Sequence, residues 1–297
     1  MKNRLKPKGI VLAGLMAPGT LLFLMCCIAP LFVAFYYSLF KWNGGPHKEF
    51  IGILNYLQLA ADKAFWGAFK NNITFIVWTV IGQIGIAFIV SMLMISRGLK
   101  LKKLHRTVIF FPVILSAVVV GFTWKIIYNK DYGLLNGLLT LIGRADWIKP
   151  WLDDPDIVIP SLAAAKIWQY IGYYMVILLA SIQSIDKEIL ECAELDGAIG
   201  WKKSVYVVVP LIKNTLMVAI MLCISGNMKT FDQIYVMTNG GPGGASEVVA
   251  MYAYRVSMER MEYGYGSTAA IGILILSLTL IGVSNLVTKR KEKGLTP

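Results

Sequence analysis

The chain has 297 residues, of which 57% are hydrophobic and only 15% are charged, whereas about 25% of residues are charged in typical soluble domains. This deficit of charge excludes an ordinary soluble domain, because much of the surface must face something other than water. The formal net charge of +12 does not indicate a nucleic-acid-binding protein, since the basic residues lie in short segments between apolar runs and form no stripe with interleaved aromatic residues.

Apolar runs long enough to cross a membrane recur along the whole chain. A transmembrane helix needs about 20 mostly apolar residues. The runs that meet or nearly meet this condition cover about residues 9–40, 71–96, 107–127, 157–185, 210–228 and 263–288. The sequence therefore predicts an all-α polytopic membrane protein with six transmembrane helices, built as a single transmembrane domain over residues 1–297.

The first apolar run follows a basic segment, as the hydrophobic part of a signal peptide does. It is, however, far longer than the roughly 7–15 residues of such a segment, and no pair of small residues marks a cleavage site at its end. We therefore interpret it as the first transmembrane helix, in which Pro18 and Pro30 are expected to introduce kinks.

Lysine and arginine are distributed unevenly among the segments that connect the spans. They are concentrated before the first span, after the last span and in the connector 97–106, which holds five of them and no acidic residue. By contrast, residues 128–156 contain three basic and five acidic residues. Because basic connectors remain in the cytoplasm, both termini are expected to be cytoplasmic. Six spans put both termini on one side of the membrane, which agrees with this expectation.

The connector from Ser184 to Val209 differs from the other predicted cytoplasmic segments because it contains five acidic residues. Apolar side chains recur there at spacings of three and four residues, which predicts an amphipathic helix. Asp186 is expected to cap the start of this helix and Gly197 to end it, while Pro210 marks the entry to the fifth span. The alternative is a helix that merely lies on the membrane surface.

Several residues of this connector stand at characteristic offsets. The tripeptide Glu191-Cys192-Ala193 is followed by Gly197 and then by Pro210. This spacing resembles the EAA loop of ABC importer permeases, which runs Glu-Ala-Ala, three residues, Gly, nine residues, Ile, one residue and Leu-Pro. Cysteine replaces the first alanine here, and valines replace Ile and Leu. The sequence Glu-Leu-Asp-Gly-Ala at 194–198 is similar to the carbohydrate-importing branch of that family.

A second, independent resemblance lies after the fifth predicted span. Residues 231–242 read Phe-Asp-Gln-Ile-Tyr-Val-Met-Thr-Asn-Gly-Gly-Pro, which is similar to the outer loop at this place in maltose-type and glycerol-3-phosphate-type permeases. The final Thr-Asn-Gly-Gly-Pro resembles the class of subunit that pairs with a different, second permease. An ordinary tight turn is the alternative interpretation of Gly-Gly-Pro. The resemblance covers nearly the whole chain.

The resemblance implies a permease subunit that translocates a sugar or oligosaccharide by alternating access, in the inner or plasma membrane of a prokaryote. The implied partners are a second homologous permease in a heterodimer, two cytoplasmic ATPase subunits, an extracytoplasmic sugar-binding protein and membrane lipid, with no nucleic acid. The residues implied to couple the chain to the ATPase are Glu188, Glu191, Ala193, Asp196, Gly197 and Gly200.

The chain itself is not expected to be an enzyme. Residues 197–204 come closest to a phosphate-binding loop, but tryptophan follows their second glycine, so the cradle for phosphate is missing. The two histidines are isolated, and the four cysteines have neither zinc-site nor disulfide spacing. We therefore expect no metal site and no cofactor on this chain, with ATP and Mg²⁺ bound by the partner ATPase subunits.

Aromatic and polar side chains in the fourth and fifth spans are the candidates for substrate contact, because aromatic faces pack on sugar rings and amides hydrogen-bond to hydroxyls. By resemblance, positions 170, 173, 223 and 227 contact the sugar in the maltose-type permease, although only Tyr173 and Asn227 keep the residue type. Val113 and Ala117 stand where polar contacts are expected. For the aromatic residues, packing between helices is the alternative. The substrate-path candidates are Lys166, Trp168, Tyr170, Tyr173, Cys223 and Asn227.

Lys166 is the one charge well inside a predicted span, and intramembrane charges are candidates for function. At about nine residues from the outer end it would lie roughly 14 Å deep and line the outer vestibule. If the helix starts later, its ammonium group instead snorkels to the lipid headgroups. For the whole chain, an ATP-independent secondary transporter is the alternative function, but it predicts inverted repeats and paired broken helices, which the sequence does not show.

Overall fold

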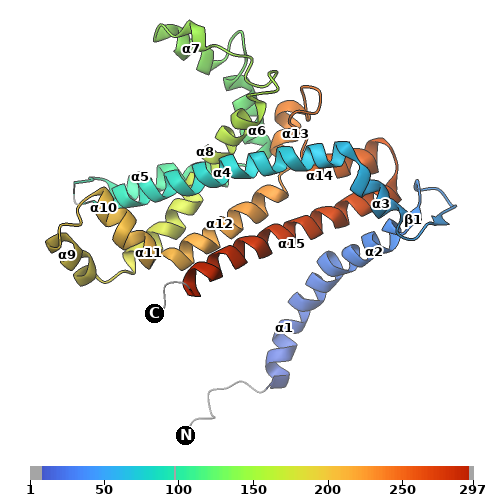
Figure 1. The fold of residues 1–297 in the computed structure, drawn as a ribbon, viewed down its shortest axis with the longest axis horizontal. Helices are drawn as coiled ribbons and strands as arrows, with labels where there is room; N and C mark the ends of the chain where they lie inside the picture. The colour runs from blue at the N-terminus through green and yellow to red at the C-terminus, as the bar shows by residue number, and fades with distance from the viewer. Residues whose placement is uncertain (1–8, 97, 294–297) are drawn as a thin grey trace. The chain divides into compact units, whose positions relative to one another are not determined.

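The computed structural model describes residues 9–96 and 98–293, most of which are helical (Figure 1). The chain forms two compact units. The first unit consists of Met1–Asp62 and Ala253–Gly272, and the second of Lys63–Tyr252 and Ile273–Pro297. The last helix, α15 (Tyr263–Lys293), begins in the first unit and continues in the second.

The first unit contains the N-terminal helices and a short hairpin. Helix α1 (Gly9–Phe23) and helix α2 (Ala29–Ser38) are joined by the π-helical turn Leu24–Ile28. Pro30, the second residue of α2, follows this turn, and its missing N–H interrupts the hydrogen-bond ladder at the place where the helix departs from α geometry. Strands β1 (Phe40–Lys41) and β2 (Glu49–Phe50) pair antiparallel, and α3 (Leu54–Ala61) follows them.

Two long helices form the centre of the second unit. Helix α4 (Lys63–Ile95) and helix α8 (Val158–Gln183) pack along each other, and α12 (Lys213–Met228) packs against both. Their shared core contains Ala87, Met175, Leu178 and Cys223, which are fully buried. Because these helices are apolar on nearly all sides, one face can pack in the protein while the other contacts lipid.

The predicted third span, residues 107–127, is divided into two helices in the structure. Helix α5 (Lys102–Phe110) continues into the 3-10 turn Phe111–Ile114, and α6 (Ala117–Ile127) leaves it at an angle of 99°. Pro112 lies in the turn and offers no N–H to a continuous helix. Ser116 then adopts an extended conformation and its Oγ accepts a hydrogen bond from Val119 N at 3.3 Å, so a new helix starts there.

The predicted fifth span, residues 210–228, is also entered through a bend. A helical stretch made of α10 (Trp201–Lys203), the π-helical turn Ser204–Val208 and α11 (Val209–Leu211) meets α12 at 80°. The continuous helix begins at Lys213 rather than at Pro210, because Ile212 leaves the helical conformation. The remaining elements are α7 (Leu134–Leu141), the 3-10 turn Ala145–Trp147, α9 (Lys187–Leu195), α13 (Asp232–Thr238), α14 (Val249–Tyr254) and the π-helical turn Arg255–Glu259.

The described helices account for between four and six membrane spans. Four are long and apolar enough to cross a membrane without interruption, namely Val11–Ser38, Lys63–Ile95, Val158–Gln183 and Tyr263–Ser284. The two bent pairs raise the number to six if each pair crosses once. The fold is therefore that of a mostly helical, multi-pass membrane protein.

Candidate functional site

The connector between α8 and α12 contains the exposed helix α9, in which no residue is buried. Its C-terminus forms a Schellman motif: Ala198 N donates to Ala193 O at 2.9 Å, and Gly197 N donates to Glu194 O at 3.1 Å. Gly197 has a φ of +84°, the left-handed conformation that L side chains resist. The predicted helix and its glycine stop are thus present in the structure.

The start of α9 differs in one detail from the sequence prediction. Asp186 occupies the N-cap position, but its side chain accepts no capping hydrogen bond. At the other end, Lys203 Nζ lies 2.6 Å from Glu194 Oε1, and this ion pair ties α10 to α9. Glu194 therefore has an internal partner, which sequence spacing alone did not reveal.

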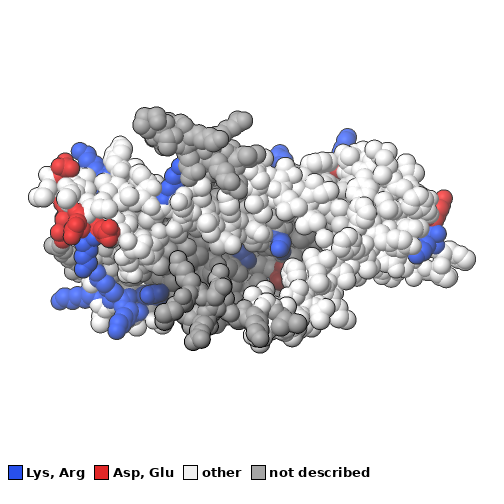
Figure 2. Space-filling view, turned by 90° about the horizontal axis from the view of Figure 1, so that it is seen from below, with Lys and Arg blue, Asp and Glu red and all other residues white. Residues whose placement is uncertain are grey.

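Three of the predicted coupling residues lie in α9 and three follow its last residue. Glu188, Asp196 and Gly197 are exposed, as is Gly200, and Ala193 is half-buried. Glu191 is exposed as well, but it also lines a cavity of about 840 Å³ between α9, α10 and the end of α4. Figure 2 shows acidic side chains gathered at the end of the molecule that carries α9.

Large apolar side chains are uncovered next to these acidic residues. Leu195, Ile199 and Trp201 are 88%, 70% and 68% exposed. Apolar groups of this size, surrounded by charges, are typical of a surface that another protein covers. In the sequence, such a surface could have been recognised from the isoleucine and the tryptophan that stand beside two glycines in this charged connector.

A chain of hydrogen bonds crosses the interior of the second unit. Gln83 Nε2 in α4 donates to Lys166 O in α8 at 3.1 Å, and Cys223 Sγ in α12 lies 3.1 Å from Gln83 Oε1. Asn227 Nδ2 donates to Cys223 O at 2.9 Å, and Asn72 Nδ2 donates to Asn227 O at 3.3 Å. Asn72 and Gln83 were not predicted as site residues, although an amide inside an apolar span is itself a signal.

Lys166 is buried within α8 rather than near its start. Helix α8 begins at Val158, and the side chain of Lys166 is 9% exposed. Its Nζ lies 4.5 Å from the centroid of the Tyr170 ring. No carboxylate lies within 4 Å of this ammonium group in the described part of the chain. The late helix start required for snorkelling is therefore not observed.

Of the remaining path candidates, two are partly exposed on different sides of α8 and two form a buried layer against α4. Trp168 and Tyr173 are 39% and 37% exposed on α8, and the Trp168 ring meets Trp124 edge-on at 5.9 Å. Cys223 and Asn227 are buried against α4. The Oδ1 atom of Asn227 is buried and finds no hydrogen-bond partner among the described residues, so it has capacity for a ligand or water.

Comparison with known proteins supports one family over most of the chain. Residues 83–293 match the family described as binding-protein-dependent transport system inner membrane component. The probable ABC transporter permease protein YurN of Bacillus subtilis is 34% identical over 262 residues, which cover 88% of this chain and 90% of that protein. The trehalose/maltose transport system permease protein MalF of Thermococcus litoralis is 30% identical over 242 residues, covering 80% and 79%.

A solved structure shares the fold. A bacterial ABC transporter involved in the import of the acidic polysaccharide alginate contains a chain that superposes with a TM-score of 0.80 at 21% identity, over 94% of this chain and 95% of that chain. Residues 83–293, which match the family described above, include α8, the connector with α9 and both halves of the bent fifth span. The chain belongs to the family of binding-protein-dependent transport system inner membrane components.

Proposed function

We propose that this permease is one of two membrane-spanning subunits of an ATP-driven importer that takes up a sugar or oligosaccharide by alternating access. The carbohydrate named for the trehalose/maltose relative supports this class of cargo. The observation that carries the mechanism is the exposed helix α9 closed by the left-handed turn at Gly197. A short, capped helix can transmit a rigid-body movement between two proteins without bending.

In this mechanism α9 docks into a groove on a cytoplasmic ATPase subunit. The exposed side chains of Leu195, Ile199 and Trp201 supply the apolar part of the contact, and Glu188 and Glu191 supply charges at its edge. Two such ATPase subunits bind ATP with Mg²⁺ and hydrolyse it, while this chain binds no cofactor. A second homologous permease completes a heterodimer, and an extracytoplasmic binding protein delivers the sugar.

The proposed topology has six spans, with each bent pair crossing the membrane once. Residues 1–297 then form one transmembrane domain, and the basic segments at both ends and at 97–106 lie in the cytoplasm of a prokaryotic cell. We expect a reporter that is active only outside the cytoplasm to be silent when it is fused after Pro297. The same reporter inserted in the loop 128–156 serves as the positive control. Activity of the C-terminal fusion would contradict the six-span topology.

We also propose that the side of α8 that carries Lys166, Tyr170 and Tyr173 lines the route of the sugar. Tyr173 and Tyr170 stand on the same side of the helix as Lys166, at intervals of three and four residues. Cys223 and Asn227 stand behind them in the buried layer and become accessible only if α12 moves. Trp168 points to another side of α8, toward Trp124.

This route predicts a specific defect. In vesicles containing the assembled importer, sugar uptake is expected to require ATP, and Tyr173→Ala is expected to lower uptake about tenfold or more, because a sugar-stacking ring is lost. The basal ATPase rate should stay unchanged, since Tyr173 lies within α8 and not in the connector that carries α9. Tyr173→Phe keeps the ring and is the matched control. Wild-type uptake by Tyr173→Ala would remove this residue from the route, and uptake without ATP would contradict the proposed function.

A further inference from the structure

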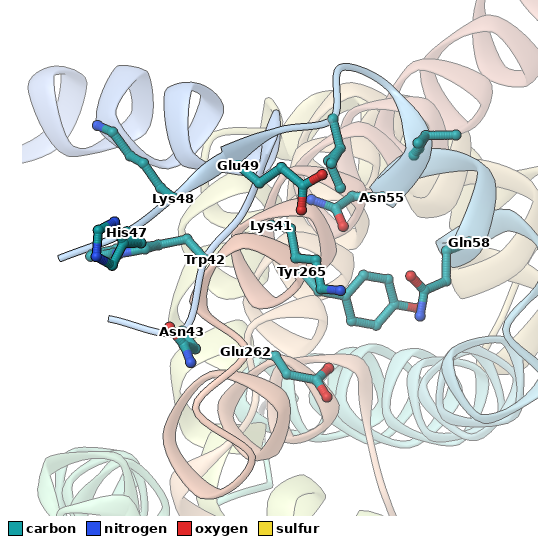
Figure 3. A pocket seen from close by; sticks show the side chains of 12 residues that line it. Lys41, Trp42, Asn43, His47, Lys48, Glu49, Asn55, Gln58, Glu262 and Tyr265 are labelled. Atoms are coloured by element: carbon teal, nitrogen blue, oxygen red, sulfur yellow. The ribbon is translucent and has the colours of Figure 1, made fainter. Parts of the chain in front are cut away.

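A pocket of about 840 Å³ opens in the first unit, and its size falls in the range of small-molecule sites, roughly 300–1,000 Å³. Its walls come from β1, β2, the loop between them, α3 and the start of α15 (Figure 3). The topology proposed above places this part of the chain on the extracytoplasmic side. None of its lining residues belongs to the predicted substrate path, which lies in the second unit.

The frame of this pocket is held by hydrogen bonds. Asn55 Nδ2 in α3 donates to Ser38 O at 2.8 Å and to Phe40 O at 3.0 Å, which fixes α3 to the end of α2 and to β1. Tyr265 Oη in α15 donates to Asp62 Oδ2 at 2.8 Å. Elements that are distant in sequence are thus joined around the cavity, so the pocket is formed before any ligand arrives.

Aromatic side chains supply part of its wall. Trp42 stacks on Tyr37, with ring centroids 4.3 Å apart and planes 15° apart, and Trp42 Nε1 donates to Gly45 O at 2.8 Å. Tyr265, the second aromatic residue of the lining, is buried. Trp42 also meets the Tyr263 ring at 5.6 Å, so both rings of the lining are fixed in orientation, and the half-buried Trp42 is the one that a ligand can contact.

Several polar groups of the lining remain available for a ligand. Asn55 is 4% exposed, and its Oδ1 accepts no hydrogen bond from the described residues. Lys41, Asn55 and Gln58 point toward a common space in Figure 3. Glu49 and Glu262 also line the cavity, and neither carboxylate forms an ion pair within 4 Å in the described part of the chain.

Lys48 is part of the frame of the pocket and is not one of the polar groups that are available for a ligand. Its Nζ donates to Tyr36 Oη at 3.0 Å and lies 4.7 Å and 5.6 Å from the ring centroids of Tyr36 and Tyr37 and 5.2 Å from that of Phe40. The hydrogen bond that the Lys48 ammonium group donates to Tyr36 raises the pKa of Lys48, so the group stays protonated where it contacts these aromatic rings. In Figure 3 its side chain points away from Asn55.

The chemistry of the lining selects one class of ligand. An apolar ligand would remove water from carboxylates and amides without replacing their hydrogen bonds, which is unfavourable. An anion is disfavoured because Glu49 and Glu262 line the cavity, and Lys41 also lines it and disfavours a simple cation. A polyhydroxylated ring satisfies the set, since hydroxyls donate to carboxylates and amide oxygens, accept from Lys41, and leave C–H groups to pack on aromatic faces.

We propose that this pocket binds a neutral oligosaccharide at a site separate from the translocation path. The experiment uses the full chain in lipid nanodiscs, which avoids detergents with sugar headgroups, and it includes neither ATP nor a binding protein. Saturation-transfer NMR with maltotriose is expected to detect binding in the unmodified chain. Glu262→Ala is expected to weaken binding about tenfold, because a hydrogen bond to a charged group is lost, and Gln58→Ala should weaken it to a smaller extent.

Glu259→Ala is the matched control, because Glu259 is an exposed acid three residues away that does not line the pocket. It is expected to bind maltotriose like the unmodified chain. Absence of saturation transfer at about 10 mM maltotriose, where a millimolar site would be mostly occupied, would overturn the proposal. Equal binding by Glu262→Ala and Glu259→Ala would overturn it as well.

Discussion

Replacing Gly197 by valine is expected to uncouple the importer while leaving the chain folded in the membrane. The residue has a φ of +84° and closes the Schellman motif that ends α9. A left-handed conformation costs an L residue roughly 1–2 kcal/mol, and a β-branched side chain adds to this cost. Because native proteins are stable by about 5–15 kcal/mol, this loss distorts the turn without unfolding the chain.

The measured effect should appear in ATP hydrolysis. In the assembled complex, substrate and binding protein should no longer stimulate the ATPase of the Gly197→Val variant, and uptake should stop, although the complex still assembles. The amount of chain in the membrane and the basal ATPase rate are the controls for folding. Normal stimulated turnover by Gly197→Val would mean that the connector is only a surface helix.

A second variant separates two causes of this defect. A Cβ added at position 197 would meet nothing within 4 Å among the described residues beyond its two neighbours, so we expect a steric effect to come from the ATPase. Asparagine tolerates the left-handed conformation better than other residues with a Cβ. If Gly197→Asn is coupled normally, the backbone conformation explains the valine defect. If it is uncoupled too, the ATPase surface approaches the glycine closely.

Replacing Gly172 by alanine is expected to destabilise the second unit. A Cβ added at Gly172 in α8 would collide with the backbone of Ile109 and lie 2.6 Å from the Cα of Phe110. These two residues end α5, immediately before the bend in the third span. Backbone atoms cannot move aside as a flexible side chain can, so α5 must separate from α8. Such overpacking costs about 1–3 kcal/mol, and we expect the upper end of this range.

Thermal unfolding in nanodiscs tests this expectation. For a chain of this size, each kcal/mol lowers the Tm by about 2–4 °C, so Gly172→Ala should unfold roughly 6–12 °C below the unmodified protein. Gly85→Ala in α4 is the matched control, because an added Cβ there meets nothing within 4 Å and alanine favours the helix. Equal melting temperatures for the two variants would show that α5 and α8 do not approach each other so closely.

The features that the sequence predicted well depend on neighbouring residues. The uninterrupted spans follow from long apolar runs, whose partition into lipid requires helical hydrogen bonding within each segment. The helix 187–195 and its stop at Gly197 follow from local periodicity and from the glycine at its end. The family was also identifiable from sequence, because the EAA spacing and residues 231–242 are continuous motifs. In each case the determining interactions lie within a few residues of one another.

The features that only the tertiary structure decided depend on contacts between distant segments. Pro112 was visible in the sequence, but neither the 99° angle that follows the turn at this residue nor the close approach of Phe110 to Gly172, 62 positions later, was. The amide of Asn72 bonds to the backbone of Asn227, 155 residues away. The pocket around Asn55 requires α3 and the start of α15 to meet at the hairpin. No local pattern specifies such pairs, because their free energy arises only when the packed helices exclude lipid and water and each buried polar group must find a partner.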